Sequence, residues 1–288
     1  MTKDQLYKEL YARYGFVTRA RNCFLYTHSG ERLTDMFQEN GKAILGWDTG
    51  NAGTFFKNMM NKGLNGSFIC EDKPRINKAV SELVGKECCA FFYNTKSDAV
   101  KAAVGFGAKT IVSYRPWNKE QEDLSKAEAV IIVPPFAWGE EIYILAVVST
   151  SSTTTNSSST TTNSSSTTSN ISVVVTVPEP VEGVETTSIK VPFSLQTALT
   201  RAIFNLISEL PLRQEKDWFI YDTILTKYWE RKGPYLYPKI SENKYEDFVK
   251  HCLDCNIVIN PSYNEPSIVP FGADKGVFTK LKNNPFEE

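Results

Sequence analysis

The sequence has no excess of charge of one sign, because 32 basic residues are balanced by 33 acidic ones and the net charge is −1. Bulk electrostatics therefore give no reason to expect a nucleic acid or an anionic membrane as partner. No apolar run approaches the length that crosses a bilayer, and the N-terminal stretch is charged and amphipathic, without the apolar core of a signal peptide. We expect a cytoplasmic protein whose partner is a cofactor or another small molecule, such as an amino-acid-like ligand.

Metal and disulfide chemistry have little support in the sequence. The chain has two His and six Cys, and the cysteine spacing shows no disulfide framework. The stretch from His251 to Cys255 contains metal-ligand residue types, but no second Cys pair exists and the other His is His28. We therefore predict no metal site and buried, reduced thiols.

The chain has enough apolar residues for a large core, but one tract has none. Of 288 residues, 41% are hydrophobic, including 17 Phe, 13 Tyr and 5 Trp. By contrast, residues 149–170 contain only Ser, Thr and Asn, and the seven-residue stretch at 153–159 is repeated at 160–166. A tract without apolar side chains cannot offset the entropy cost of ordering, so we predict a disordered low-complexity insert.

The stretch from Ala90 to Tyr114 is the most informative about function. It is predicted to form a strand, a polar turn, a short helix and a second strand. Backbone N–H groups converge at a helix start, where the hydroxyls of Thr95 and Ser97 and the ammonium of Lys96 would add donors for an anion. The alternative is an ordinary capped helix that binds nothing.

Other segments have patterns of helices and strands. Residues 4–14 are predicted to form an amphipathic arm with Tyr7, Tyr11 and Tyr14 on one face, available for packing or for a subunit contact. Residues 24–36 are predicted to form a hairpin around a Ser-Gly turn. Helices are expected at 52–64, 74–86, 194–210, 217–229 and 245–255, and strands at 129–133, 141–148, 171–177, 257–261 and 266–270.

The turn from Asn94 to Val100 resembles the Asn-Ser-Gly-Thr-Glu-Ala-Val turn with which fold-type-I pyridoxal-phosphate aminotransferases hold the cofactor phosphate. The hairpin at 24–36 resembles the entry segment of that family, and residues 43–47 follow where the family has Asn-Leu-Gly-His. The order of hairpin, helix, helix, strand and turn matches over residues 20–115.

The resemblance implies an α/β fold: a mainly parallel central sheet with helices on both faces, and a smaller α+β region built from the N- and C-terminal segments. It implies residues 1–50 as arm and hairpin, 51–214 as the cofactor-type domain and 215–288 as the C-terminal small domain. Pyridoxal phosphate would contact Thr95, Lys96 and Ser97, with Trp117 stacked on its ring. A homodimer is also implied.

The departures from the family concern the chemistry. Lys96 replaces the family's Gly, and no Asp lies between Asp123 and Asp217, where the acid for the pyridine nitrogen is expected. No Lys lies between Lys126 and Lys190, which leaves Lys190 as the candidate for the Schiff base. No Arg follows Arg231 to bind a substrate carboxylate in the C-terminal region.

Three hypotheses remain open. The first is a shortened, divergent aminotransferase-like protein that lacks a competent transaminase site and binds any pyridoxal phosphate without a covalent bond. The second is an active enzyme that uses Lys190. The third is a non-enzymatic binding or assembly protein, in which the turn at Thr95 only caps a helix.

Overall fold

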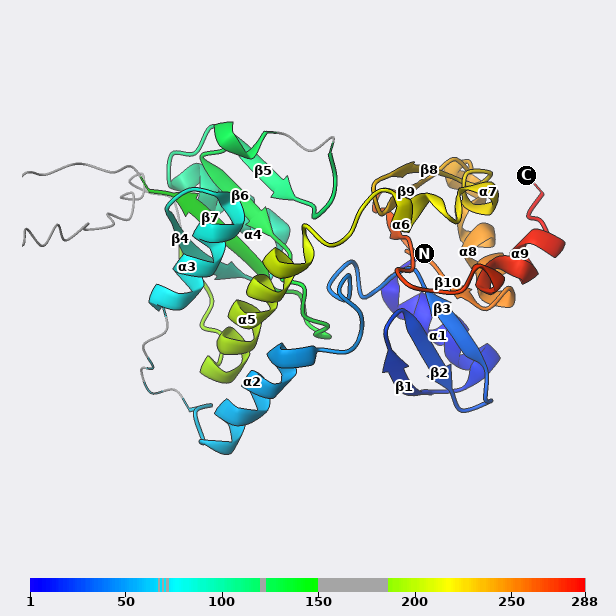
Figure 1. The fold of residues 1–288 in the computed structure, drawn as a ribbon, viewed down its shortest axis with the longest axis horizontal. Coiled ribbons are helices and arrows are strands. Elements are labelled where there is room, and N and C mark those ends of the chain that lie inside the picture. Colours follow the sequence, from blue (N-terminus) through cyan, green and yellow to red (C-terminus); the bar gives the residue numbers. More distant parts are fainter. Residues whose placement is uncertain (67, 69, 71–72, 120–122, 150–185, 288) are drawn as a thin grey trace, which may run out of the picture.

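In a computed structural model, the chain forms two lobes that are joined by extended segments (Figure 1). The structure describes residues 1–66, 68, 70, 73–119, 123–149 and 186–287. The low-complexity tract, apart from Ser149, and the strand expected at 171–177 lie outside these residues. The larger lobe contains α2–α5 and β4–β7, and both chain ends lie in the smaller lobe (Figure 1).

The larger lobe is a four-stranded sheet with the order β4-β7-β6-β5. Helices cover both faces: α4 packs on one face, and α3 and α5 pack on the other, where α2 lies beside α5 (Figure 1). The elements of this lobe are α2 (Gly50–Asn61), α3 (Lys73–Val84), β4 (Cys88–Tyr93), α4 (Lys96–Gly105), β5 (Ile111–Tyr114), the 3-10 turn η1 (Leu124–Lys126), β6 (Ala129–Ile132), β7 (Tyr143–Val148) and α5 (Phe193–Glu209).

The strand directions correct one detail of the expected sheet. Strands β4, β5 and β6 run in the same direction, but β7 runs opposite to them and lies between β4 and β6. Of the hydrogen-bonded pairs in this sheet, only β5–β6 is therefore parallel. The ten residues between β6 and β7 form no helix, and a connection of that kind is too short for the crossover that a parallel neighbour requires.

The smaller lobe combines the two ends of the chain, as the predicted α+β region requires. Its core joins residues 6–37 with residues 218–281, and β3 pairs in parallel with β10. Its elements are α1 (Lys3–Tyr14), β1 (Val17–Arg21), β2 (Phe24–Thr27), β3 (Arg32–Asp35), α6 (Lys216–Phe219), α7 (Asp222–Leu225), β8 (Trp229–Lys232), β9 (Tyr235–Pro238), η2 (Glu242–Lys244), α8 (Tyr245–Asp254), β10 (Ile257–Val258), β11 (Ser267–Ile268), η3 (Lys275–Phe278) and α9 (Thr279–Asn283).

Most local predictions match these elements, with one clear exception. The hairpin at 24–36 forms from β2 and β3, which are antiparallel, and the long helices begin and end within three residues of the predicted ends. The helix expected at 217–229 is wrong, because the chain forms two short helices there and then enters the β8–β9 hairpin. The buried residues Trp218, Tyr221, Leu225 and Trp229 follow helical spacing, but Tyr228 and Trp229 lie outside the short helices and pack on Phe248 of α8.

Most of the aromatic face of α1 packs against other segments of the same chain. Leu6 and Leu10 are buried, Tyr7 packs on Phe37, and the Tyr14 hydroxyl donates to the Leu253 carbonyl. Only Tyr11 of the three tyrosines is strongly exposed.

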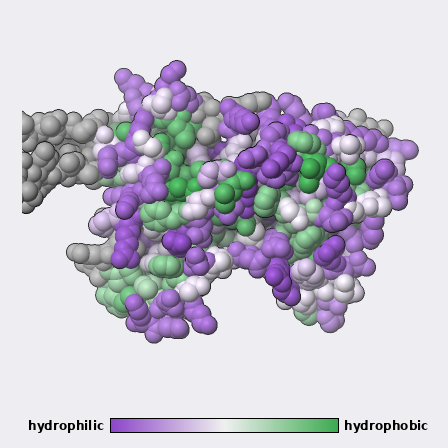
Figure 2. Space-filling model, viewed as in Figure 1, coloured by the Kyte–Doolittle hydropathy of each residue, from purple (hydrophilic) through white to green (hydrophobic). Residues whose placement is uncertain are grey.

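Hydrophobic surface also gathers over α2, at the lower left of Figure 2, where Phe55 and Met60 are exposed. The described part of the chain contains no helix with the length and apolar character that crossing a membrane needs.

Candidate ligand-binding site

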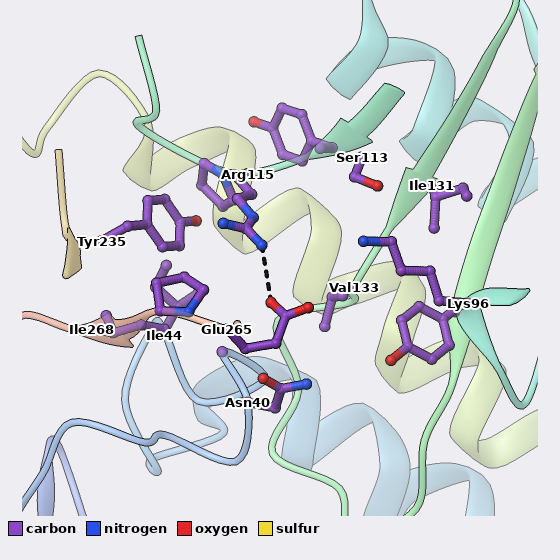
Figure 3. Close-up of a pocket in the computed structure, with 15 residues that line it drawn as sticks. Asn40, Ile44, Lys96, Ser113, Arg115, Ile131, Val133, Tyr235, Glu265 and Ile268 are labelled. Carbon is purple, nitrogen blue, oxygen red and sulfur yellow. Dashed lines mark hydrogen bonds and ion pairs between the residues drawn. The ribbon is translucent and has the colours of Figure 1, made fainter. Parts of the chain in front are cut away.

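A pocket of about 90 Å³ lies where the larger lobe faces the smaller one (Figure 3). Strands β5 and β6 end at it, and α4 begins beside it. The carboxyl edge of a sheet is the usual ligand position in α/β folds. The smaller lobe closes the pocket with residues from the segment after β3, from β9 and from the turn before β11. The polar residues that line the pocket come from both lobes: Asn40, Lys96, Ser113, Tyr114, Arg115, Tyr143, Tyr235 and Glu265.

Helix α4 begins as the sequence predicts, but its capping hydroxyl is occupied. Thr95 is the extended N-cap residue, and its hydroxyl oxygen accepts from the Asp98 backbone N–H at 3.0 Å. The same hydroxyl donates to the Asp98 carboxylate at 2.7 Å, which holds the pKa of that carboxyl below its ordinary value. The hydroxyl of Thr95 is therefore occupied by hydrogen bonds to Asp98 within the helix start, and Thr95 does not line the pocket.

Lys96 is the one residue of the predicted Thr95–Ser97 turn that lines the pocket. Figure 3 shows its side chain extending from the α4 side into the group of pocket residues. Its ammonium has neither a hydrogen bond nor an ion pair with any described residue. Ser97 is exposed and does not line the pocket. Lys96 is thus a cation in the pocket wall that no described side chain neutralises.

Arg115 and Glu265 form an ion pair across the pocket from opposite lobes (Figure 3). The Arg115 Nη2 lies 3.0 Å from the Glu265 Oε2, and its Nη1 donates to the Tyr237 hydroxyl at 2.6 Å. The guanidinium also lies over the Tyr235 ring, 5.6 Å from its centroid. Glu265 is the only acidic residue among those lining the pocket, and Arg115 already neutralises it.

A left-handed turn from Gln38 to Gly41 forms one wall of the pocket. The φ angles of Gln38, Glu39, Asn40 and Gly41 are 48°, 50°, 58° and 87°. Three consecutive non-glycine residues in this conformation are unusual, because each costs roughly 1–2 kcal/mol. The turn places Asn40 and Gly41 in the pocket wall.

Buried charged groups hold this turn in place. The Asp35 carboxylate accepts hydrogen bonds from the backbone N–H groups of Phe37 and Gln38 and from the Trp47 indole N–H, at 2.8 to 3.0 Å. Glu39 pairs with Lys3 and accepts from the Tyr7 hydroxyl at 2.7 Å. These bonds tie α1 and the end of β3 to the wall of the pocket.

Trp117 does not enter the pocket, although its neighbours Arg115 and Pro116 do. Its indole N–H donates to the Leu210 carbonyl at 3.1 Å, and its ring packs between the cores of the two lobes. Its φ of 59° brings its carbonyl close to Gly233. The aromatic residues that do line the pocket are Tyr114, Tyr143 and Tyr235, and burial raises the pKa of each hydroxyl.

Lys190 lies outside both pockets found in the described part of the chain. It is exposed on the segment that runs beside β4, where the neighbouring Ile189 N–H donates to the Phe92 carbonyl at 2.9 Å. His251 and Cys255 do approach each other, at 3.8 Å. No group of three potential metal ligands occurs among the described residues.

Several residues of the pocket were not predicted from the sequence. Arg115 follows β5 at the carboxyl edge of the sheet, which is a position where functional residues are common, so strand assignment could have identified it. Glu265 and Tyr235 come from the other lobe, and nothing local in the sequence indicates that they face Lys96. Asn40-Gly41 reads as a turn, but not as part of a pocket.

The fold is similar to that of aminotransferases of known structure. The chain is similar to ornithine δ-aminotransferase of Plasmodium falciparum, with a TM-score of 0.62 and 11% identity over 98% of this chain and 97% of that one. It is also similar to acetylornithine aminotransferase of Elizabethkingia anophelis, with a TM-score of 0.60 and 11% identity over 98% of both chains. At these identities the likeness establishes the fold alone.

Two further comparisons refine this picture. Ornithine aminotransferase of Toxoplasma gondii, whose structure has partial occupancy of pyridoxal phosphate at its active site, has a TM-score of 0.59 and 9% identity over 98% of this chain and 94% of that one. In sequence, an uncharacterised protein of Treponema pallidum (strain Nichols) is 25% identical over an alignment of 289 positions that covers 91% of each chain. No protein-family model matches the chain.

The pocket residues fit only one part of pyridoxal phosphate. Lys96 and the start of α4 suit the phosphate group. The pyridine nitrogen needs an acid, but Glu265 is paired with Arg115, and the aldehyde needs a lysine, which would again have to be Lys96. The volume of about 90 Å³ is also below the roughly 300 Å³ at which sites for small organic ligands begin. The described residues therefore do not fit the whole cofactor, and no catalytic step follows from it.

Proposed function

We propose that this protein is an aminotransferase-like binding protein that holds a small anionic group without a covalent bond and does not catalyse transamination. The observation that carries the proposal is Lys96, an ammonium in the pocket between the lobes with no partner among the described residues. The phosphate of pyridoxal phosphate is the first candidate for that group, since structural neighbours of this fold are aminotransferases.

Binding would rest on charge and on donors at one end of the pocket. The Lys96 ammonium would pair with the anion, and so would the Lys96 and Ser97 amides of the first turn of α4, whereas the Asp98 amide is already capped by Thr95. The Ser113 hydroxyl lines the same pocket and could donate. Arg115 would add to the positive electrostatic potential of the pocket without contacting the anion, because its guanidinium already donates to Glu265 and Tyr237.

The same residues argue against transamination. That chemistry requires a lysine for the Schiff base, an acid at the ring nitrogen and a group that binds the substrate carboxylate. The pocket offers one lysine and one carboxylate, and the carboxylate is neutralised across the lobes. The alternative enzyme based on Lys190 has no support from its exposed position beside β4.

The test is a binding series on purified protein by isothermal titration calorimetry. Pyridoxal phosphate and inorganic phosphate should bind, whereas pyridoxal, which lacks the phosphate, should not. Lys96→Ala removes one charge-assisted interaction and should weaken binding roughly 10- to 150-fold. Lys190→Ala is the matched control, because it removes the same charge from an exposed site outside the pocket.

Borohydride reduction followed by peptide mass analysis tests the non-covalent part of the proposal. No phosphopyridoxyl adduct is expected. An adduct on Lys96 or on Lys190, together with absorbance in the visible, would overturn the non-catalytic conclusion and restore an enzyme of the aminotransferase class. Equal phosphate binding by wild type and Lys96→Ala would instead support the simple capped helix.

A further inference from the structure

A second cavity, of about 420 Å³, lies between the start of α2, the C-terminal half of α5 and the loop at Pro135–Ala137. It is larger than the pocket between the lobes and falls within the size range of small-molecule sites. The proposed anion site at Lys96 shares no residue with this cavity.

Arg201 is the residue that draws attention to this cavity. It projects from α5 and lines the cavity, and it has no hydrogen bond or ion pair with any described residue. Its Nε is fully covered and has no acceptor, and its guanidinium lies over the Phe55 ring at 5.7 Å. A guanidinium that lines a cavity and has no acidic partner among the described residues favours an anion in that cavity.

The acids of the cavity do not supply that acceptor. Glu209 pairs with Arg213 at 3.2 Å, and Arg213 is 8% exposed and also donates to the Ile44 carbonyl at 3.0 Å. Asp48 accepts from the Asn22 backbone N–H at 3.1 Å and lies 3.9 Å from Arg21. Both carboxylates are thus engaged elsewhere, and the positive charge of Arg201 remains unbalanced.

Other polar side chains line the same cavity, although the Ser208 hydroxyl donates to the Phe204 carbonyl at 3.0 Å and so offers the cavity an acceptor. Asn205 and Ser208 follow Arg201 at positions i+4 and i+7, so all three share one face of α5. Helix α2 begins at Gly50, and its N-cap residue Thr49 makes no side-chain capping bond. The positive end of this twelve-residue helix therefore adds to the charge of Arg201.

We propose that this cavity binds a phosphomonoester, with the phosphate held by the guanidinium of Arg201 and by the start of α2. A guanidinium can give two parallel N–H bonds to phosphate oxygens, here from its two Nη groups, because the Nε of Arg201 is covered by the chain itself. The remaining volume accommodates a small polar organic part, for which Asn205 and Ser208 offer hydrogen-bonding groups.

The test uses ribose 5-phosphate as the probe, with inorganic phosphate and ribose as comparisons, at constant ionic strength. Ribose 5-phosphate should bind the full-length protein more tightly than ribose does. Arg201→Gln should weaken that binding about tenfold or more, the loss expected for one charge-assisted interaction. Arg19→Gln makes the same change at an exposed residue of β1 and should bind like wild type.

Two further measurements distinguish binding in this cavity from binding in the pocket between the lobes. Lys96→Ala should leave binding of ribose 5-phosphate in the second cavity unchanged, which separates this site from the pocket between the lobes. In the wild-type protein, the arginine N–H resonance that disappears in Arg201→Gln should shift on titration with the probe. If that resonance does not move, or if Arg201→Gln binds as tightly as wild type, the proposal is wrong. If Arg201→Gln fails to fold, Arg201→Lys, which also lacks the guanidinium, identifies the resonance in its place.

Discussion

Replacement of Asp35 by Asn should remove a pH-dependent contribution to stability. Asp35 is 1% exposed and accepts hydrogen bonds from the N–H groups of Phe37 and Gln38 and from the Trp47 indole. Those bonds favour the ionised carboxylate, but burial outweighs them and raises the pKa of Asp35 from 3.8 to about 6. The native state therefore binds this proton more tightly than the unfolded chain does.

The direction and the size of the change in stability with pH follow from this difference in pKa between the native and the unfolded state. A rise from 3.8 to about 6 corresponds to roughly 3 kcal/mol, at about 1.36 kcal/mol for each pKa unit. The stability contributed by protonated Asp35 is full below the unfolded pKa and is lost as the pH rises through about 6. Between pH 4 and pH 7, the stability of wild type relative to Asp35→Asn should fall by roughly 2 to 3 kcal/mol.

The assay is urea unfolding, followed by fluorescence, of wild type and Asp35→Asn at several pH values between 4 and 7. The difference between their free energies of unfolding isolates the titration of Asp35, because other groups titrate in both proteins. Asp4→Asn serves as the control, since it removes the same charge from an exposed position on α1 and should give a flat difference.

A constant offset between wild type and Asp35→Asn, whatever its size, would refute the reasoning. It would mean that burial does not control the ionisation of Asp35. A difference that grew with pH would be equally damaging, because it would show that the hydrogen bonds outweigh burial.

Three other predictions concern packing, the insert and assembly. Gly233→Ala should destabilise the protein by more than Gly107→Ala, because both glycines have positive φ but only a Cβ at Gly233 would lie 2.5 Å from the Trp117 carbonyl oxygen; thermal unfolding measures the difference, and equal losses would contradict it. Deletion of residues 151–170, which contain only Ser, Thr and Asn, should change the melting temperature little, since halving a loop changes its closure free energy by about 0.6 kcal/mol; a large loss would show that the tract is structural. Sedimentation at micromolar concentration should show a homodimer, shifted toward monomer by Tyr11→Glu on the exposed face of α1; monomer alone in wild type would contradict this.

Local patterns in the sequence were enough to predict much of the architecture. The hairpin of β2 and β3, the β4–turn–α4 unit and helices α2, α3, α5 and α8 each follow from hydrophobic spacing and from turn or capping residues. Such signals work because they act between residues a few positions apart. The order of these elements also allowed the combined region of N- and C-terminal segments to be expected, and the structure confirms it.

The pocket itself depends on contacts that no local pattern encodes. Lys96 was identified as a candidate from its place at a helix start, but its lack of a partner among the described residues and the Arg115–Glu265 pair are visible only in three dimensions. Trp117 shows the same limit: its spacing after β5 suggested a stacking residue, but packing between the lobes draws the ring away from the pocket.

The sequence alone therefore determined most of the elements, the segment from α6 to β9 excepted, because helix and strand periodicity, capping and turn chemistry are properties of neighbouring residues. Only the tertiary structure decided the direction of β7, the left-handed turn at Gln38–Gly41 and the meeting of Lys96 with residues 150 or more positions away. Those features depend on burial and on electrostatic contacts between distant segments, which exist only after the two lobes have come together.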